Sequence, residues 1–141
     1  GLTAAIEWMA RDVAGRADLD VTLKGDDVGP MAGSITTAAY RIAQEAVTNV
    51  VRHAQARSVT IELHRDEKGL RMTIVDDGVG MRQPADAPAT LGMLGMRERA
   101  EDLGGSVVWE AGVRGGTRVS VYIPFQFEGR RPEADGATPN S

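Results

Sequence analysis

A carboxylate and an amide four residues apart form the first pair in this sequence that could do chemistry. Glu45 and Asn49 lie within residues 34–56, which contain no Gly or Pro and carry apolar residues at helical spacing. Such a helix places both side chains on one face, at the mouth of an apolar pocket. Their oxygens suit Mg²⁺, which proteins hold with one or two side chains plus phosphate and water. For this helix alone, an equal alternative is that Asn49 only bridges to a neighbouring backbone group.

The second candidate group ends a predicted strand. Apolar residues alternate along residues 70–74, and Asp76 continues their face, so its carboxylate should point toward the core. A buried carboxylate needs a partner, and this one could accept a hydrogen bond from an exocyclic amine such as that of adenine. Gly78 and Gly80 follow it and permit sharp backbone turns. An ordinary Asp-Gly turn is the alternative, and a calcium loop would need a ligand series that is missing here.

A third group is rich in glycine. Residues 78–95 contain Gly and Pro throughout and are long for a loop in a compact domain, which predicts either a functional lid or a disordered segment. Within them, residues 91–97 (LGMLGMR) open a helix, whose free backbone N–H groups could bind phosphate. This segment fits neither a Walker loop nor a Rossmann fingerprint. Gly115-Gly-Thr117 precedes the last predicted strand, and for that piece alone a hairpin turn is the favoured interpretation.

The elements that must position these groups follow from the apolar periodicity. Helices are predicted over residues 2–15, 34–56 and 96–103, with Ser34 as an N-cap and with Gly15 and Gly104-Gly105 as stops. Strands are predicted around residues 19–23, 59–63, 70–74, 107–109 and 119–123. Every strand has one apolar face, so we predict an α+β two-layer sandwich, with helices covering one face of a mixed, mostly antiparallel sheet. We expect residues 1–127 to form the domain and residues 128–141 to be a disordered tail.

Composition excludes several classes of function. The 141 residues suggest one domain, and a net charge of −4 argues against a broad basic surface that grips nucleic acid. Cysteine is absent, so thiolate metal sites and disulfides are excluded. The two histidines, His53 and His64, are too far apart in the sequence to suggest a zinc site. Without an apolar run of membrane-spanning length or a signal peptide, the domain is expected in the cytoplasm, as a fragment of a longer protein.

The order of these motifs resembles the ATP-binding catalytic domain of sensor histidine kinases, whose fold is shared with DNA gyrase and MutL. An N-box helix, Asp-x-Gly-x-Gly, a glycine-rich lid and Gly-Gly-Thr occur in that order. Residues 40–54 (YRIAQEAVTNVVRHA) and 91–105 (LGMLGMRERAEDLGG) are similar to the short sensor kinases that pair with LuxR-type response regulators, such as nitrate/nitrite sensors. The resemblance covers roughly residues 1–125 and implies the ATPase fold of these proteins.

The resemblance also implies roles for individual residues. Glu45 would act as a base or position a magnesium-bound water, and Asn49 would ligate the Mg²⁺ that bridges the phosphates of ATP. Arg52 would reach phosphate, His53 would stack near the nucleotide, and Asp76 would accept from the adenine amine. The remaining positions implied to contact ATP are Gly78, Gly80, Met81, Gly92, Met93, Leu94, Gly95, Met96 and Thr117.

Three positions depart from the family pattern. Thr90 stands at the first lid glycine, Met93 stands at the lid leucine, and Asp77 stands where Asn is commoner and adds negative charge near the pocket. By resemblance, the γ-phosphate goes to a histidine on a dimerisation domain outside this chain, and then to a LuxR-type response regulator. The full-length protein would be a homodimer, with an anchor in the cell membrane as one option. Two rivals stay open: an anti-sigma-factor serine kinase of the same fold, and an interaction module that has lost ATP.

Overall fold

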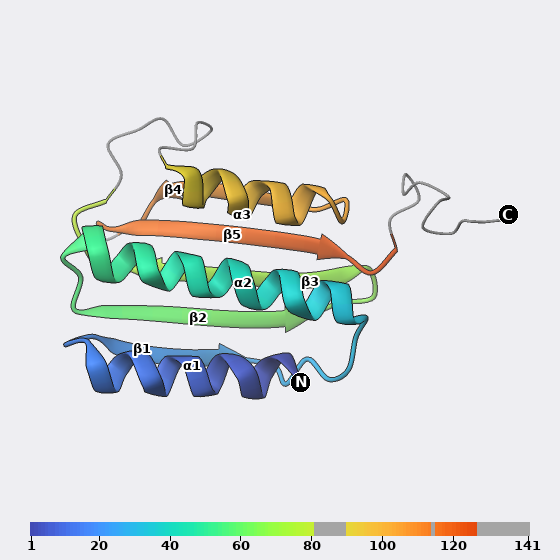
Figure 1. The fold of residues 1–141 in the computed structure, drawn as a ribbon, viewed down its shortest axis with the longest axis horizontal. Helices are drawn as coiled ribbons and strands as arrows, with labels where there is room; N and C mark the ends of the chain where they lie inside the picture. The colour runs from blue at the N-terminus through green and yellow to red at the C-terminus, as the bar shows by residue number, and fades with distance from the viewer. Residues whose placement is uncertain (81–89, 114, 127–141) are drawn as a thin grey trace, which may run out of the picture.

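A five-stranded sheet carries three helices on one of its faces. The computed structural model describes residues 1–80, 90–113 and 115–126, except for the side chain of Ala54. In Figure 1 the three helices lie side by side across the sheet, with α2 between α1 and α3. This arrangement confirms the predicted two-layer sandwich with its helices on one face.

The strands form a mixed sheet in which one pair is parallel. Its order is β1-β2-β3-β5-β4; β1 and β2 are parallel, and the other neighbouring pairs are antiparallel. The parallel pair requires a long crossover, which α2 supplies on the helical face. The strands are β1 (Asp20–Gly25), β2 (Ser58–Arg65), β3 (Gly69–Asp76), β4 (Ser106–Ala111) and β5 (Thr117–Pro124).

One row of apolar side chains runs across all five strands beneath the helices. The register aligns Leu23 with Ile61, Ile61 with Ile74, Ile74 with Val119, and Val119 with Trp109. The last four of these side chains are buried. Period-two alternation along each strand therefore produces a continuous core face, and the opposite face carries Thr, Ser and charged side chains.

The helices bury one stripe each, but their ends differ from the sequence predictions. The helices are α1 (Leu2–Arg16), α2 (Gly33–Asn49) and α3 (Leu91–Glu101), and α2 continues into one π-helical turn, η1 (Val50–Ala54). Ser34 is not the N-cap of α2: Ala32 is, and no side chain caps that end. Gly15 does not stop α1, which ends one residue later. The predicted 34–56 helix instead ends through η1 at Gln55, which has a φ of 53°.

The start of α3 is the largest correction. The sequence predicted a helix from Met96, whereas α3 begins at Leu91. Thr90 explains the difference, because its Oγ1 accepts a hydrogen bond from the backbone N–H of Met93 at 3.1 Å and so caps the helix. The predicted glycine stop is confirmed: Gly104 has a φ of 81°, and the N–H of Gly105 donates to the carbonyl of Ala100 at 2.8 Å.

Two expectations from the sequence concern membrane spans and the C-terminal tail. The first can be checked only in the part of the chain that the structure describes. None of its helices combines the length and apolar character needed to cross a membrane. The tail predicted for residues 128–141 lies outside the described residues.

Candidate functional site

Asp76 is the only buried charged side chain among the described residues. It ends β3 on the core face, as the strand alternation predicted, and only 6% of its surface is exposed. One carboxylate oxygen, Oδ1, accepts a hydrogen bond from the backbone N–H of Gly78 at 2.8 Å. Burial raises the pKa of Asp76 above its ordinary value, while backbone hydrogen bonds from Gly78 and Thr117 oppose the shift. A carboxylate held this way has unused acceptor capacity toward a donor that enters the site.

The turn before β5 closes over Asp76. Gly116 is buried with a φ of 76°, and a Cβ there would overlap the backbone carbonyl of Asp76 and lie 2.9 Å from its Oδ1. Gly80, with a φ of 84°, lies on the other side of this turn, where a Cβ would be 3.3 Å from the carbonyl oxygen of Gly116. Only glycine permits this close approach of two backbone segments. Sequence reasoning placed Thr117 here and missed Gly116, although the consecutive glycines were its signal.

The neighbouring Asp77 faces away and has a different task. Its Oδ1 accepts from the backbone N–H groups of Arg57 at 2.8 Å and Ser58 at 3.0 Å, and its Oδ2 accepts from the hydroxyl of Ser58 at 3.0 Å. These hydrogen bonds lower the pKa of Asp77, and the bond from Ser58 has a larger effect than the one from Arg57. Asp77 therefore fastens the end of β3 to the start of β2, and its negative charge is taken up by these donors.

Glu45 and Asn49 lie one turn apart on α2, and both are half-buried. Neither side chain makes a hydrogen bond or ion pair with any residue that the structure describes. The carboxylate of Glu45 lies against the backbone of Gly92 in the first turn of α3, so closely that a Cβ on Gly92 would overlap Oε2. Two half-buried oxygen donors without partners fit a site that is completed by a cation and its ligands.

These donors suit Mg²⁺ better than a transition metal. The described residues contain no group of three or more His, Asp or Glu side chains that could hold a metal by themselves. A carboxylate and an amide are hard oxygen ligands, and Mg²⁺ is usually held by one or two such groups plus phosphate and water. Asn49 and Glu45 therefore fit a magnesium ion that arrives with a phosphate ligand.

The first turns of α3 divide the predicted lid residues into three groups. Met93 and Met96 are buried in the hydrophobic core, whereas Leu94 is 39% exposed. Gly92 contacts Glu45, and a Cβ on Gly95 would meet nothing within 4 Å. Gly92 and Gly95 are thus helical residues, and the predicted lid loop ends at Thr90. Met81 and the rest of residues 81–89 lie outside the described residues.

Arg52 and His53 lie on the π-helical turn that follows α2. Both are exposed, and neither contacts another described side chain through a hydrogen bond, ion pair or ring contact. The turn places them beyond Asn49 on the same continuous helical segment. They are therefore available to a ligand, but the structure does not bring them into contact with Asp76 or Glu45.

Several segments that carry these residues meet at one end of the molecule. In Figure 1 the C-terminal end of α2, the end of β3, the start of β5 and the start of α3 all lie at the left. Residues far apart in the sequence, such as Asn49, Asp76 and Thr117, are thereby gathered around one end of the sheet. The N-terminus of α3 adds free backbone N–H groups and positive dipole charge at the same place, which favours an anion.

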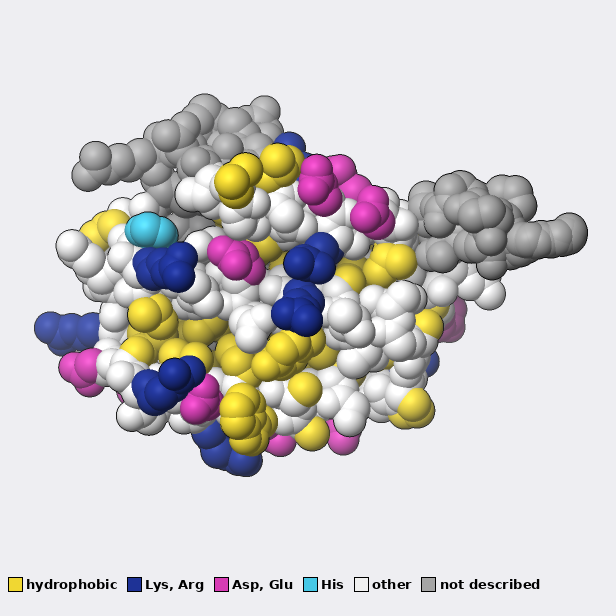
Figure 2. Space-filling view, in the orientation of Figure 1, with side chains coloured by type: hydrophobic (Ala, Val, Ile, Leu, Met, Phe, Trp, Pro, Cys, Tyr) yellow, Lys and Arg dark blue, Asp and Glu magenta, His cyan; other side chains and the backbone are white. Residues whose placement is uncertain are grey.

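The described surface has hollows at several places, and those relevant here differ in their lining. A cleft of about 250 Å³, the α2–α3 cleft, is lined by Arg41, Gln44 and Glu45 of α2 and by residues of α3 that include Gly92 and Arg99. An apolar groove of about 350 Å³ between α1 and α2 is visible on the helical face in Figure 2 as a yellow patch, with Trp8 63% exposed.

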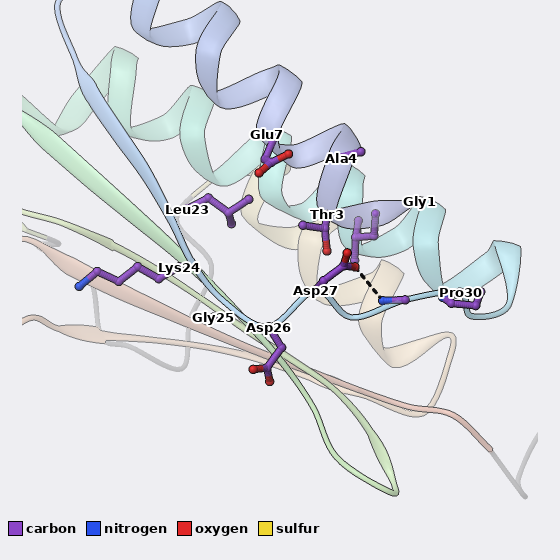
Figure 3. A pocket seen from close by; sticks show the side chains of 12 residues that line it. Gly1, Thr3, Ala4, Glu7, Leu23, Lys24, Gly25, Asp26, Asp27 and Pro30 are labelled. Carbon is purple, nitrogen blue, oxygen red and sulfur yellow. Dashed lines mark hydrogen bonds between the residues drawn. The ribbon is translucent and has the colours of Figure 1, made fainter.

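A further hollow, of about 550 Å³, lies at the N-terminal end of α1 (Figure 3). Its lining includes the carboxylates of Glu7, Asp26 and Asp27, and Asp27 accepts from the N–H of Gly29 at 3.1 Å. Lys24 also lines the hollow, and the charged side chains of the lining together still carry negative charge, which disfavours a phosphate ligand. None of the residues that the motifs single out lines this larger hollow, whereas several of them, Glu45 and Gly92 included, line the α2–α3 cleft.

Comparisons with known proteins identify the family of the chain. Residues 35–127 match the family described as histidine kinase-, DNA gyrase B- and HSP90-like ATPase. The sensor histidine kinase YxjM of Bacillus subtilis is 34% identical over 129 residues, which is 89% of this chain and 30% of that protein. The oxygen sensor histidine kinase NreB of Staphylococcus carnosus is 36% identical over 92 residues, which is 64% of this chain and 26% of that protein. The chain thus spans less than a third of the length of these relatives.

Solved structures show the same fold. The histidine kinase domain of the blue-light activated kinase EL346 from Erythrobacter litoralis superposes with a TM-score of 0.68 at 25% identity, covering 86% of this chain and 62% of that one. The ATP-binding domain of PrrB from Mycobacterium tuberculosis gives a TM-score of 0.70 at 23% identity, covering 89% of this chain and 95% of that one. The chain belongs to the family of histidine kinase-, DNA gyrase B- and HSP90-like ATPases, as an ATP-binding catalytic domain of the kind found in sensor histidine kinases.

Proposed function

We propose that this domain binds Mg-ATP and donates its γ-phosphoryl group to a histidine on a separate dimerisation domain of the same protein. The observation that carries the proposal is the buried Asp76 beneath Gly116, at the end of the sheet where α2 and α3 also present their free polar groups. Asp76 accepts a hydrogen bond from the exocyclic amine of adenine. A carboxylate that is shielded from water strengthens this bond and selects adenine over bases that lack the amine.

The phosphates lie between α2 and the start of α3. Asn49 would ligate Mg²⁺, and Glu45 would contact the ion through a water molecule. When bound, the ion would neutralise part of the negative charge of the phosphates. Backbone N–H groups around Gly92 and the guanidinium of Arg52 bind phosphate oxygens. The remaining positions, which include Gly78, Gly80, Met81, Leu94, Gly95 and Thr117, shape the walls of this nucleotide site.

The transfer step is a displacement at phosphorus. A nitrogen of the acceptor imidazole forms a bond to the γ-phosphorus, the bond from that phosphorus to the bridging oxygen breaks, and ADP leaves with the electron pair. Glu45, which has no partner among the described side chains, accepts the proton from the acceptor ring. The domain contributes positioning and charge neutralisation, so the isolated chain binds nucleotide and turns over little.

The pathway beyond this domain rests on resemblance to the short sensor kinases. We assign the next step to a response regulator with a LuxR-type DNA-binding domain, and a homodimeric state to the full-length protein. The domain itself works in the cytoplasm, with a membrane anchor placed elsewhere in the protein. Phosphorylation of purified candidate regulators by the full-length protein, followed over time, identifies the partner, and transfer to none of them contradicts this assignment.

Calorimetric titration of ATP into this domain tests the nucleotide site. With Mg²⁺ we expect saturable binding that Asp76→Asn weakens roughly 10- to 100-fold, because a buried hydrogen bond to a charged group is lost. Asn49→Ala should remove the dependence on Mg²⁺. Asp77→Asn is the matched control, since its carboxylate faces β2, and it should bind ATP as the unchanged domain does.

A folded domain that binds no ATP contradicts the proposal and leaves an interaction module as the function. Binding that is equally weakened by Asp76→Asn and Asp77→Asn would place adenine somewhere other than at Asp76. Circular dichroism of each variant separates either outcome from a loss of fold.

A further inference from the structure

The α2–α3 cleft carries two arginines that the nucleotide site does not use. Arg41 lies on α2 and Arg99 on α3, on opposite walls of the cleft, and both are exposed. Neither makes a hydrogen bond, ion pair or ring contact with any residue in the described part of the chain. By contrast, Arg16 and Arg71 each pair with a carboxylate. Two guanidiniums that line one hollow and have no partner among the described residues are suited to bind an anion.

The geometry of α2 keeps Arg41 free. Arg41 and Glu45 are four residues apart on one helix, a spacing at which opposite charges usually pair. Here the carboxylate of Glu45 instead leans against the backbone of Gly92 on α3. The cleft therefore has a carboxylate at one end and two guanidiniums beside it, and these three charged groups sum to one positive charge.

The rim of the cleft has the character of a protein interface. Leu91, which lines the cleft, is 85% exposed, and Leu94 in the same turn is 39% exposed. Figure 2 shows dark blue Lys or Arg side chains beside a magenta carboxylate in the middle of the helical face, between α2 and α3. Arginine is enriched at surfaces that bind another protein, and the exposed leucines add apolar area beside it.

We propose that Arg41 and Arg99 bind a carboxylate on the acceptor segment, about one helical turn from the histidine that is phosphorylated. The inference rests on the proposed function, in which the acceptor imidazole must reach Glu45 to give up its proton. Arg41 lies about one turn, roughly 6 Å, before Glu45 on α2, toward the N-terminus of the helix. An acceptor segment whose imidazole meets Glu45 therefore places its neighbouring turn against Arg41 and Arg99.

The charge of the cleft favours a carboxylate over a free phosphate. Glu45 repels a phosphate dianion, and a net charge of one cannot neutralise it. A segment with an imidazole N–H at Glu45 and one carboxylate at the arginines satisfies all three charged groups. Arg41 and Arg99 are positioning residues, because they hold the acceptor rather than the reacting atoms.

Autophosphorylation of the full-length protein tests this site. In Arg41→Glu and Arg99→Glu, the rate with saturating ATP should fall roughly tenfold or more, because a repulsive pair replaces an attractive one, while the Kd for Mg-ATP stays within about twofold. Replacing the partner Asp or Glu within one turn of the acceptor histidine by Lys should restore the rate of the Glu variants. Lys68→Glu, in the turn between β2 and β3, is the charge-matched control and should keep the normal rate.

The outcomes separate this inference from the proposed function. If the unchanged protein transfers no phosphate to histidine, the proposed function fails. If it does so, and both Arg variants react at the normal rate, the cleft inference alone is overturned. It is also overturned if the variants lose ATP affinity, because the arginines would then serve the nucleotide, or if no Lys substitution near the acceptor histidine restores the rate.

Discussion

Asp76 and Asp77 are neighbours in the chain that occupy opposite environments. Asp76 points into the core and its pKa is raised by burial, whereas Asp77 is exposed and its pKa is lowered by the donors of Ser58 and Arg57. Strand alternation alone predicted that Asp76 points inward. The role of Asp77 could not be predicted, because its partners lie about twenty residues away and depend on the register between β2 and β3.

The raised pKa of Asp76 predicts that the ionised form of this carboxylate lowers the free energy of unfolding of the domain. The folded domain binds this proton more tightly than the unfolded chain, so stability falls as pH rises from the ordinary aspartate pKa to the raised one, and stays lower above it. Asp76→Asn should therefore have a Tm at pH 7 equal to or above that of the unchanged domain, with the difference shrinking toward pH 4. Thermal unfolding followed by circular dichroism across this pH range measures it.

Asp77→Asn should behave in the opposite way. Its carboxylate stabilises the fold above the unfolded pKa, and this contribution is lost as pH falls, so the variant should have a lower Tm at pH 7 but not at acid pH. In the unchanged domain, the affinity for ATP should weaken as pH falls through the raised pKa of Asp76, because the carboxylate then becomes protonated. A Tm at pH 7 that drops in Asp76→Asn as much as in Asp77→Asn contradicts this assignment.

At the scale of the elements, the turn before β5 requires a glycine at position 116. In Gly116→Ala the new Cβ overlaps the carbonyl of Asp76, and the residue must keep a φ of 76°, which costs about 1–3 kcal/mol for the backbone alone. Gly15→Ala is the control, since its Cβ meets nothing within 4 Å inside α1 and should stabilise by up to about 1 kcal/mol. Urea unfolding of both variants checks the contrast; equal effects would contradict it.

The contact between Glu45 of α2 and Gly92 of α3 leads to a second prediction at the level of the helices. Gly92→Ala places a methyl group where the carboxylate of Glu45 lies, so Glu45 must move, while the fold should persist because only the end of a flexible side chain is displaced. Autophosphorylation of the full-length protein should fall roughly 100-fold, the usual contribution of a catalytic base. Gly95→Ala adds its methyl group to open space, so its effect should be much smaller. Equal rates in the two variants would show that Glu45 takes no part in the transfer step.

Helix ends were harder to predict than helix faces. The apolar stripe of α2 followed from the sequence, but its N-cap fell on Ala32 rather than Ser34, and its last turn became π-helical. Periodicity does not distinguish an α-helical turn from a π-helical one over five residues. In α3, glycine content suggested a loop through Gly95, and the cap supplied by Thr90 outweighed it.

At the scale of the whole molecule, nucleotide binding should stabilise the fold. The proposed site joins α2, α3 and the central strands, so only the folded domain binds Mg-ATP. At a nucleotide concentration of 100 times Kd the domain should gain about 2.7 kcal/mol, which corresponds to a Tm rise of roughly 5–15 °C. Asp76→Asn, with its 10- to 100-fold weaker binding, should gain only about 0.4–1.4 kcal/mol in a thermal shift assay at the same concentration, and a full rise in that variant would contradict the site.

The layers were predictable, and the order of the strands was not. Alternation in each strand and the three helical stripes were enough for a two-layer sandwich with a mixed sheet. The sheet order β1-β2-β3-β5-β4, with β5 inserted between β3 and β4, depends on where α3 crosses and on pairings between distant residues. For the same reason the sequence motifs suggested the nucleotide site but could not reveal the free arginines of the α2–α3 cleft.

The parallel pair of β1 and β2 at the edge of the sheet affects how the domain partly unfolds. β1 hydrogen-bonds only to β2, and α1 packs mainly on β1 and α2, so these two elements form an outer unit. The strands β3 and β5, which carry Asp76 and Thr117, lie further inside the sheet. Backbone amides of β1 should therefore exchange with deuterium well before those of β3, by partial unfolding that leaves the inner strands intact. The N-terminal unit can detach and return while the floor of the nucleotide site stays folded.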